Sequence, residues 1–339
     1  MTPGNVPDIR PFLRQVGAGG RRARDLSLQD ARAAAACILD GGATPAQVGA
    51  FLIALRVKEE TAEELAGFAL AVRERRASIA ALPDPTIDCA SAYDGRVRTI
   101  PVGPAAALVA AADGVGALFH GVRGLGRAGL GPAETMAEIV PAIPGAAPIV
   151  YIDQTSYCPT LAALLPIRNQ ISLRTAFNTA EKLAAPGQTA AGDPPLLIGF
   201  FHGGFLERVA AAAKIVGVQR VMAVQGSEGS DEIPITRDSQ VCELRDGRLQ
   251  KWVVNLRDVG IEPAPASMLE IDPADTSKTF ERLREALRGE PGPVREAIVM
   301  SAAARLYLAD RAQTLAEGVA LARRLLEKIR RWLPPGPTT

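Results

Sequence analysis

The sequence is short of aromatic rings and histidines. Aromatic residues make up 4% of the 339 residues, whereas hydrophobic residues, rich in alanine, make up 47%. This balance favours close-packed helices over an aromatic-rich β sandwich. His120 and His202 have no cysteine or acidic neighbours at ligand spacing, so the pattern does not indicate a zinc site. No GxSxG segment accompanies His202-Gly203-Gly204, which we interpret as a strand-to-helix turn rather than an oxyanion loop.

Cysteine and long apolar runs are also scarce. The cysteines at positions 37, 89, 158 and 242 are far apart and form no CxxC pair. This usage fits a reducing cytoplasm better than a disulfide or zinc framework. The first residues contain no apolar core of the signal-peptide type, and no apolar run is long enough to span a bilayer. We therefore expect a soluble cytoplasmic protein without a membrane partner.

The chain has almost no net charge, because it contains 38 basic and 37 acidic residues, which gives a formal charge of +1. Nucleic-acid binding would therefore need a local basic groove, since the whole chain provides no general attraction for phosphates. At this length one hydrophobic core is usually too small, so two domains are expected.

Three helices are predicted near the amino end, at residues 27–42, 44–58 and 61–76. Ser27, Thr44 and Thr61 are suitable amino-terminal caps, and Pro45 suits a first helical turn. These helices predict a compact helical unit whose alanine-lined faces are a candidate dimerisation surface.

After residue 85 the pattern changes to short apolar strands that alternate with alanine-rich helices. Such alternation predicts a largely parallel sheet covered on both faces. A hairpin with an Asp-Gly turn is expected at residues 239–254, a Pro/Gly/Ala linker at 183–195, and a frayed tail at the end of the chain. The expected strands are residues 86–89, 116–119, 149–152, 196–200 and 218–224.

A glycine-rich loop follows the strand expected at 218–224. It reads GSEGSDEI over residues 226–233 and carries the adjacent carboxylates Asp231 and Glu232. Open α/β sheets hold ligands at the carboxyl ends of their strands, and magnesium prefers oxygen ligands that it shares with substrate phosphates. Asp231 and Glu232 are therefore a candidate magnesium site. A polar turn whose acids face water would have the same pattern.

Three blocks in register carry a family resemblance: residues 26–74, RNQISLRTAFN at 168–178, and VQGSEGSDEI at 224–233. They resemble anthranilate phosphoribosyltransferase, a glycosyltransferase family 3 enzyme of tryptophan synthesis. The resemblance implies an α/β fold of the nucleoside phosphorylase/phosphoribosyltransferase type, with a small all-helical domain and a larger α/β domain around a mainly parallel central sheet. It also implies an interdomain cleft, a homodimer formed through the helices, and magnesium binding by Asp231 and Glu232.

The domain boundaries follow from the same comparison. We expect a helical dimerisation domain at 1–82, joined by helices from about 156–185. The α/β domain is expected at 83–155 and 186–335, with a frayed tail at 336–339.

The chain departs from the family where those enzymes bind pyrophosphate. Their GTGGD loop aligns with Ser91-Ala92-Tyr93-Asp94-Gly95, and Tyr93 would place a ring on the path of the phosphate. The glycines are needed because backbone donors must approach the ligand closely. The family's Asn-x-Ser-Thr stretch corresponds to Pro-Val-Gly-Pro at 101–104. Since each charge-assisted bond to phosphate contributes about 1.5–3 kcal/mol, we expect that the chain does not make phosphoribosyl anthranilate.

Other family positions are kept. The family's KHGNR stretch reads Phe-His-Gly-Val-Arg here, which retains His120, Gly121 and Arg123. The following loop, 124–134, has Arg127 as its one charged donor before the glutamate.

Further along, Arg168 matches the arginine of the family's anthranilate site, and Arg174 begins the block that follows. A structural role, as ion pairs that orient the two domains, is the alternative for both arginines. The segment AEKLAAPG at 180–187 replaces the family's LGPLTNP and adds Glu181 and Lys182 at the edge of the cleft.

These residues lead to one main hypothesis. A branch of the family that lacks the phosphoribosyl pyrophosphate signature includes proteins that bind nucleic acid through basic grooves, and this chain is similar to it in what it has lost. Arginines suit phosphate groups because they are planar and bidentate. We expect a phosphorylated ligand, either DNA, RNA or a nucleotide, in the cleft. The basic residues expected to converge there are Arg96, Arg98, Arg123, Arg127, Arg168, Arg174 and Lys182.

Three alternatives remain. In the first, the arginines are scattered and solvated, as a high arginine content allows. In the second, the protein is a magnesium-dependent pentosyltransferase or phosphorylase with a different donor or acceptor, in which Arg168 or His120 orients the acceptor. The third is a structural dimer without a ligand, with Tyr93 and the prolines at 101 and 104 filling the cleft.

Overall fold

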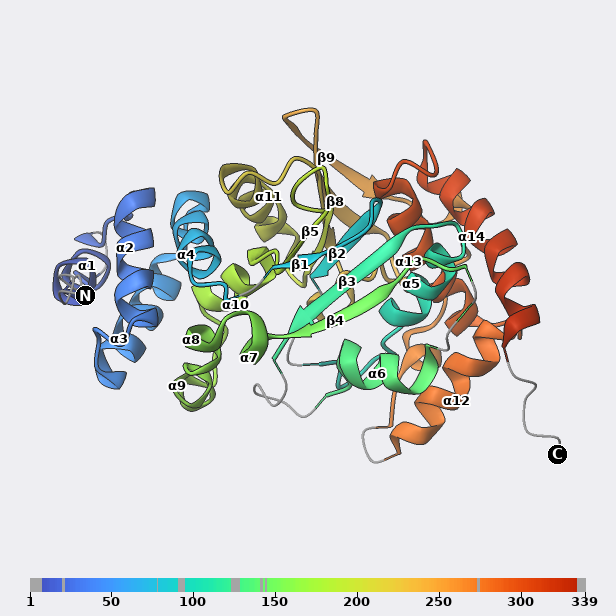
Figure 1. The fold of residues 1–339 in the computed structure, drawn as a ribbon, viewed down its shortest axis with the longest axis horizontal. Helices are drawn as coiled ribbons and strands as arrows, with labels where there is room; N and C mark the ends of the chain where they lie inside the picture. Colours follow the sequence, from blue (N-terminus) through green and yellow to red (C-terminus); the bar gives the residue numbers. More distant parts are fainter. Residues whose placement is uncertain are drawn as a thin grey trace.

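The computed structural model describes residues 8–19, 22–77, 79–90, 95–122, 129–140, 143, 145–272 and 275–333. In this part of the chain a small helical region joins a larger α/β region, as Figure 1 shows with α1 to α4 at one end and α13 and α14 at the other. The α/β region is built on a mostly parallel sheet, so the expected fold class is confirmed.

The helical region forms as its local signals predict. Ser27, Thr44 and Thr61 each accept a backbone N–H from the third residue of the helix that follows. At Thr44 and Thr61 this cap is a reciprocal capping box, which satisfies two amide donors that would otherwise be unpaired. The helices are α1 Ile9–Val16, α2 Leu28–Leu39, α3 Pro45–Lys58 and α4 Ala62–Glu74.

Small residues let α2 and α4 approach closely. A side chain at Gly67 in α4 would overlap Ala31 and the backbone of α2. Glu64 is fully buried beside this contact, where it accepts the backbone N–H of Leu26 at 2.8 Å and pairs with Lys58 at 2.9 Å. The alanine-rich sequence therefore forms a tightly packed helical unit around one satisfied charge pair.

Within the described residues the main sheet has seven strands in the order β4-β3-β2-β6-β7-β8-β9. The first five are parallel, and the last two form an antiparallel hairpin against β7. The strands are β2 Thr86–Ala90, β3 Gly116–Gly121, β4 Ile149–Asp153, β6 Leu196–Phe200, β7 Val221–Gln225, β8 Ser239–Arg245 and β9 Arg248–Val254.

Two details of the sheet bear on the sequence predictions. The strand expected from residue 218 begins at Val221, because the Val218 N–H bonds to the Ala213 carbonyl and completes the end of the preceding helix. The hairpin turn was predicted correctly: Asp246 and Gly247 both have positive φ, 51° and 72°, as a tight Asp-Gly turn requires.

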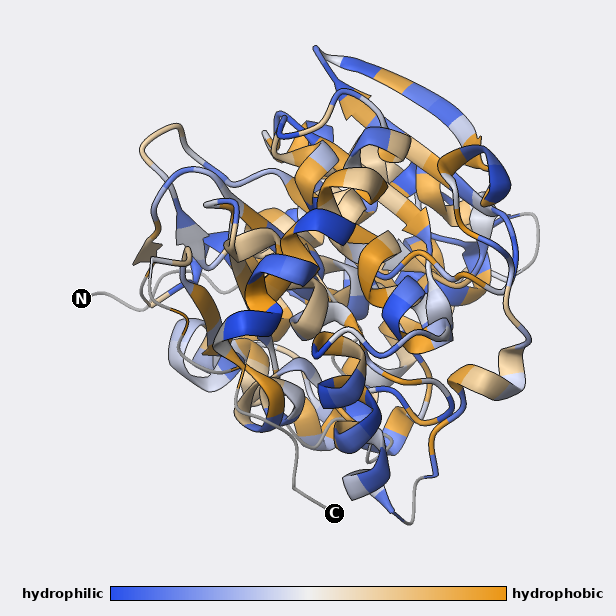
Figure 2. Ribbon diagram, turned by 90° about the vertical axis from the view of Figure 1, so that its right-hand side faces the viewer, coloured by the Kyte–Doolittle hydropathy of each residue, from blue (hydrophilic) through white to orange (hydrophobic). Residues whose placement is uncertain are grey.

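Helices cover both faces of the sheet (Figure 1). One apolar cluster joins β2, β3 and β7 to α5 Gly103–Ala111, α12 Thr276–Leu287, α13 Pro293–Leu308 and α14 Leu315–Ile329. The other joins the opposite face to α11 Leu206–Ile215 and continues into α1 to α4, so it crosses the boundary expected at residue 82. Figure 2 shows hydrophobic residues concentrated on the inner strands and inner helix surfaces. The remaining long helix, α6 Pro132–Ile139, lies beside α12.

Short elements between β4 and β6 connect the two regions. They are α7 Gln154–Tyr157, α8 Pro159–Ala162, α9 Leu165–Ile171, α10 Ala176–Ala180, the 3-10 turn η2 Glu181–Leu183, and β5 Gly187–Gln188, which pairs in parallel with β1 Ala80–Ala81. Phe177 of α10 packs edge-on against Phe68 of α4, with ring centroids 4.9 Å apart. Among the helices that the structure describes, none combines the length and the apolar character of a membrane-spanning helix.

Candidate functional site at the carboxyl ends of the parallel strands

The loop after β7, residues 226–232, is named here the acid loop. It folds back on itself, since Ser227 N–H bonds to the Glu232 carbonyl at 3.1 Å. A Cβ atom on Gly199 or Gly226 would overlap the carbonyl oxygen of Ser230. Glycine is therefore required at both positions, because only a missing side chain lets the end of β6 and the acid loop approach so closely.

Asp231 and Glu232, the predicted magnesium ligands, both point into the protein. Asp231 is fully buried and forms an ion pair with Arg305 of α13. Glu232 accepts Arg96 Nη1 at 2.7 Å through Oε2 and the Gly103 N–H at 2.8 Å through Oε1. The acid pair therefore does not face water, which rules out the polar-turn interpretation.

Glu228 is a third acid in this loop, and the sequence patterns did not single it out. Its carboxylate accepts the backbone N–H groups of Val97, Arg98 and Thr99 and the Thr99 hydroxyl, and it lies 3.3 Å from Arg96 Nε. Burial alone would raise the pKa of Glu228, but these hydrogen bonds and the Arg96 charge lower it below its usual value. Glu228 thus attaches the acid loop to the segment after β2.

These contacts allow a test of whether the loop fits magnesium, the metal implied by the resemblance. Magnesium needs near-octahedral oxygen ligands, several of them water. Glu232 has both oxygens engaged by protein donors, and Asp231 keeps one buried oxygen, Oδ1, without a hydrogen-bond partner. One such oxygen in a buried, arginine-paired site does not fit a hydrated divalent cation. Among the described residues, no group of three or more histidine, cysteine, aspartate or glutamate side chains is arranged to hold a metal.

Arg168, expected at an acceptor site, lies in a buried ion pair. Its Nη1 and Nη2 donate to Glu181 Oε2 and Oε1 at 2.9 and 2.7 Å, and Gln154 donates to Oε2 at 2.8 Å. Arg168 and Glu181 are only 5% and 2% exposed. The pairing is bidentate, the geometry in which guanidinium recognises any carboxylate most strongly. Glu181, which the sequence comparison noted as an addition, is thus the direct partner of Arg168.

Lys182, the neighbouring addition, is also buried. Its Nζ donates to the carbonyls of Gly199 and Gly229 at 2.8 and 3.2 Å and lies 4.6 Å from the centre of the Phe200 ring. Lys182 therefore ties η2 to the end of β6 and to the acid loop.

Asp88 lies in the middle of β2, and His120 lies next to the last residue of β3. His120 Nε2 is 3.1 Å from Asp88 Oδ1, and its Nδ1 is 3.4 Å from the hydroxyl of Tyr157. All three side chains are buried, and burial raises the pKa of Tyr157 well above its usual value. A carboxylate, an imidazole and a neutral phenol in sequence can orient or relay a proton. His120 was predicted as a site residue, whereas Asp88 and Tyr157 were missed.

Some of the other predicted site residues are described by the structure, and the rest lie outside the described residues. Gly121 ends β3, Gly95 has a φ of 73° and packs against Gly129, and Arg174 is exposed. A Cβ atom on Gly229 would lie 3.5 Å from Arg174 Nη1, so this guanidinium lies at the acid loop. Outside the described residues lie Ser91, Ala92, Tyr93, Asp94, Arg123 and Arg127.

The described residues do not form the basic groove that was expected. Arg96, Arg168 and Lys182 are 3–5% exposed and contact carboxylates or carbonyls. A groove that binds a phosphate backbone needs its cations at the surface. Arg98, 66% exposed at its side chain, and Arg174 are the predicted basic residues that reach solvent in the described part.

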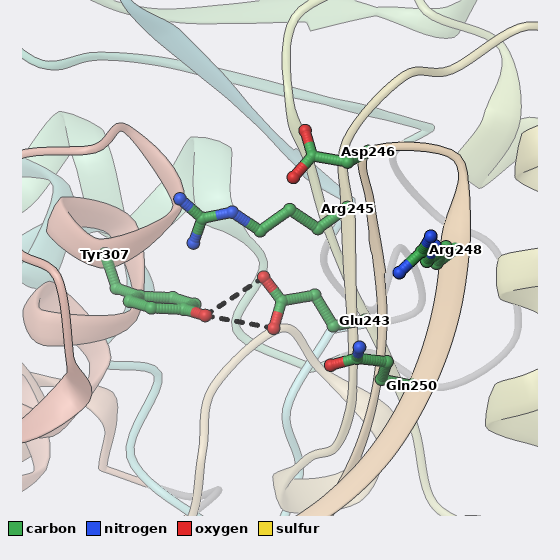
Figure 3. Close-up of a pocket in the computed structure, with 6 residues that line it drawn as sticks. All are labelled: Glu243, Arg245, Asp246, Arg248, Gln250 and Tyr307. Atoms are coloured by element: carbon green, nitrogen blue, oxygen red, sulfur yellow. Dashed lines mark hydrogen bonds between the residues drawn. The ribbon is translucent and has the colours of Figure 1, made fainter.

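A separate pocket lies at the opposite edge of the sheet, against the β8–β9 hairpin (Figure 3). It has a volume of about 430 Å³ and is lined by Glu243, Arg245, Asp246, Arg248, Gln250 and Tyr307. Tyr307 donates to both Glu243 oxygens at 3.0 and 3.1 Å, and Arg245 pairs with Asp310 at 3.2 Å. Because ligands of such sheets bind at the carboxyl ends of the strands, the acid-loop edge is the better candidate site.

Comparisons with known proteins agree with this architecture. The model of the glycosyl transferase family, helical bundle domain, matches residues 10–76, and that of the glycosyl transferase family, a/b domain, matches residues 84–328. The anthranilate phosphoribosyltransferase of Symbiobacterium thermophilum is 34% identical, over 95% of this chain and 97% of the relative. That of Acidithiobacillus ferrooxidans is 30% identical, over 96% of each chain.

Solved structures give the same result. The anthranilate phosphoribosyltransferase from Thermus thermophilus has a TM-score of 0.77 at 25% identity, covering 95% of this chain and 96% of that one. The enzyme from Saccharomyces cerevisiae in complex with PRPP and Mg has a TM-score of 0.74 at 18% identity, covering 96% and 94%, and so supports the fold alone. With both family domains matched along nearly its whole length, the chain belongs to glycosyltransferase family 3, as an anthranilate phosphoribosyltransferase-like member.

Proposed function

We propose that this protein binds a phosphorylated ligand, a nucleotide or a sugar phosphate, at the carboxyl ends of β2, β3, β6 and β7, and does not use anthranilate as an acceptor. The observation that carries this proposal is the buried, bidentate ion pair between Arg168 and Glu181. Arg168 matches the anthranilate-site arginine of the family, and here both of its terminal nitrogens already bind a carboxylate.

An external carboxylate would have to displace that of Glu181. The displaced Glu181 would then remain buried without its counter-charge, which costs about 3–5 kcal/mol. Binding of anthranilate through Arg168 is therefore disfavoured even where the surrounding shape is retained.

The phosphate part of the proposal rests on the acid-loop edge. Arg174 is exposed there, beside Gly229, and Arg98 is exposed on the segment held by Glu228. Guanidinium groups at the surface suit phosphates. Two exposed arginines match a small phosphorylated ligand better than a polymer, so we place DNA and RNA second to a nucleotide or sugar phosphate.

A genetic test and a binding test examine this proposal together. We expect the gene not to restore growth without tryptophan in a strain that lacks anthranilate phosphoribosyltransferase. Calorimetric titration should detect a nucleoside monophosphate or ribose 5-phosphate, and R174Q should weaken that binding at least tenfold. Restored growth, or heat from anthranilate but none from any phosphate, would sink the proposal. Salt-sensitive binding of fluorescent single-stranded DNA, lost in R98Q and R174Q, would favour the nucleic-acid alternative.

A second candidate is pentosyl transfer to an acceptor without a carboxylate. The Asp88–His120–Tyr157 arrangement favours it, because a carboxylate-oriented imidazole at the strand ends suits general acid–base chemistry. Release of phosphate or pyrophosphate from a pentose phosphate in the presence of an acceptor, lost in H120Q, would identify such an enzyme.

We also propose that the protein acts as a cytoplasmic homodimer through its helical region. Val57 of α3 supports this, since this apolar residue is 78% exposed. Light scattering should give twice the mass of one chain, and V57E should lower it towards that of a monomer.

A further inference from the structure

We propose that Arg96 and Arg305 replace a divalent cation as the counter-charges of the acid loop, so that this site works without magnesium. The inference goes beyond the identity of the ligand, because it concerns how the protein itself neutralises Asp231 and Glu232.

Arg305 reaches Asp231 from α13. It is 1% exposed, its Nη2 pairs with Asp231 Oδ2, and its Nη1 donates to the Ser301 carbonyl at 2.8 Å. An arginine side chain keeps its positive charge in proteins. The guanidinium is therefore a permanent cation at this carboxylate.

Arg96 has the same role at Glu232. Its Nη1 lies 2.7 Å from Glu232 Oε2 and 2.8 Å from Ser230 Oγ, and its Nε lies 3.3 Å from Glu228 Oε1. One buried guanidinium thus bridges two acids of the loop. The second oxygen of Glu232 is taken by Gly103 N–H at the start of α5.

Each acid of the loop is paired with at least one guanidinium. Asp231, Glu232 and Glu228 are opposed by Arg305, Arg96 and Arg98, the last at 3.7 Å from Glu228. A divalent cation would leave two excess positive charges among buried groups and would have to displace a guanidinium. Binding of the metal is therefore opposed by charge as well as by the lack of open oxygen ligands.

These pairs also join distant elements. Arg305 lies 74 residues from Asp231, and Arg96 lies 136 residues from Glu232. They connect the acid loop to α13 and to the segment after β2. The loop is thus already held in place by the protein, and no metal is needed to order it.

Binding of Mn²⁺, followed by electron paramagnetic resonance on the purified full-length protein, tests the inference. We expect the spectrum of free Mn²⁺ to stay unchanged, and neither MgCl₂ nor EDTA to shift the thermal unfolding midpoint. The anthranilate phosphoribosyltransferase from Saccharomyces cerevisiae, which has a solved structure in complex with PRPP and Mg, is the positive control. Stoichiometric Mn²⁺ binding by the wild type that disappears in E232Q would overturn the inference.

The variant R96Q provides the complementary test. The glutamine amide can take the place of Arg96 Nε at the Thr99 hydroxyl, but it removes the charge between Glu228 and Glu232. We expect R96Q to gain Mn²⁺ binding and to be stabilised by magnesium, and E232Q in the same protein to cancel the gain. R73Q is the matched control, because Arg73 is also mostly buried and pairs with Asp193 at 2.6 Å away from the acid loop.

R73Q should lose stability without gaining metal binding. A folded R96Q that binds no Mn²⁺ contradicts the proposed role of Arg96. If R96Q does not fold, the wild-type measurement alone decides. Since no organic ligand is used, this result is independent of whether the protein binds a sugar phosphate or a nucleotide.

Discussion

Arg168 and Glu181, thirteen residues apart, form two parallel hydrogen bonds of 2.9 and 2.7 Å inside the protein. Gln154 adds a third bond to the same carboxylate. The pair links α9 to η2, which lies between the helical region and the sheet. Arg168, which matches a substrate contact of the family, is thus already paired within the chain. Its ability to bind a carboxylate ligand therefore depends on Glu181.

Removal of the Glu181 charge should free Arg168. We expect E181Q to bind benzoate or anthranilate at least tenfold more tightly than the wild type, because the Arg168 guanidinium then no longer pairs with a carboxylate of the protein. It should also lower the free energy of unfolding by about 3–5 kcal/mol, since Arg168 remains buried. Calorimetry and urea denaturation measure the two effects.

E243Q is the matched control for E181Q. Glu243 is also buried, but it bonds to Tyr307 on the far side of the sheet. The E243Q variant should show no gain in carboxylate affinity. An equal gain in both variants would mean that the effect is one of general charge, not of Arg168.

The Asp231–Arg305 pair should behave as a coupled unit in stability. R305M leaves Asp231 buried without a counter-charge and should cost about 3–5 kcal/mol. D231N combined with R305M should recover a substantial part of that loss, because no isolated charge remains. A double-mutant cycle by chemical denaturation measures the coupling, and simple additivity of the two losses would argue against the pair.

The close approach at the acid loop predicts a sharp difference between glycines. G199A and G226A should both lower the thermal unfolding midpoint strongly, because the added methyl group meets the Ser230 carbonyl. G204A is the control, since no atom lies within 4 Å of a Cβ atom at that position. Differential scanning calorimetry on the three variants tests this, and an equal effect at all three positions would contradict the close contact with Ser230.

Acid should weaken the contribution of Glu228. Its pKa is lowered in the folded protein, where the Thr99 hydroxyl, Arg96 and backbone N–H groups together outweigh burial. A carboxyl group of this kind stabilises the folded protein when the pH is above the pKa of 4.5 that the group has in the unfolded chain. This stabilisation is lost as the pH falls through the lower pKa of the folded protein. E228Q should therefore be less stable than the wild type at neutral pH, with the two converging in acid. Denaturation over a pH series checks this, and a constant gap would refute it.

Phe177 should be important for the connection between the two regions. F177A removes a fully buried ring that packs on Phe68 at 4.9 Å, and should cost about 3–5 kcal/mol. F201A is the control, because Phe201 is 49% exposed and should change stability little. Urea denaturation of both variants gives the comparison.

Much of the fold could be predicted from the sequence because the signals are local. Ser27, Thr44 and Thr61 begin helices through contacts three residues away, and the Asp246-Gly247 turn depends on the backbone of two residues. The expected strands were found for the same reason. The start of β7 was missed by three residues, because the Val218 N–H bonds back to the Ala213 carbonyl of α11, and apolar periodicity does not reveal this bond.

The candidate site was predictable in position but not in its contacts. The acid loop, His120 and Arg168 stand out in the sequence, and glycine-rich strand exits mark ligand edges. Arg305 was missed because it follows a run of alanines in α13, with no local feature to connect it to Asp231. The only available signal was a charged residue on a face that is otherwise apolar.

The sequence alone therefore determined the fold class, the helix caps, the strands and the place of the acid loop, because each depends on residues close in the chain. The tertiary structure decided the state of the charges. Three charged side chains are paired within the chain instead of facing a ligand: Asp231 with Arg305, Glu232 with Arg96, and Arg168 with Glu181. Arg305 and Arg96 come from segments that are distant in the sequence. Burial then makes those pairings obligatory, since a charge removed from water must be neutralised within the protein.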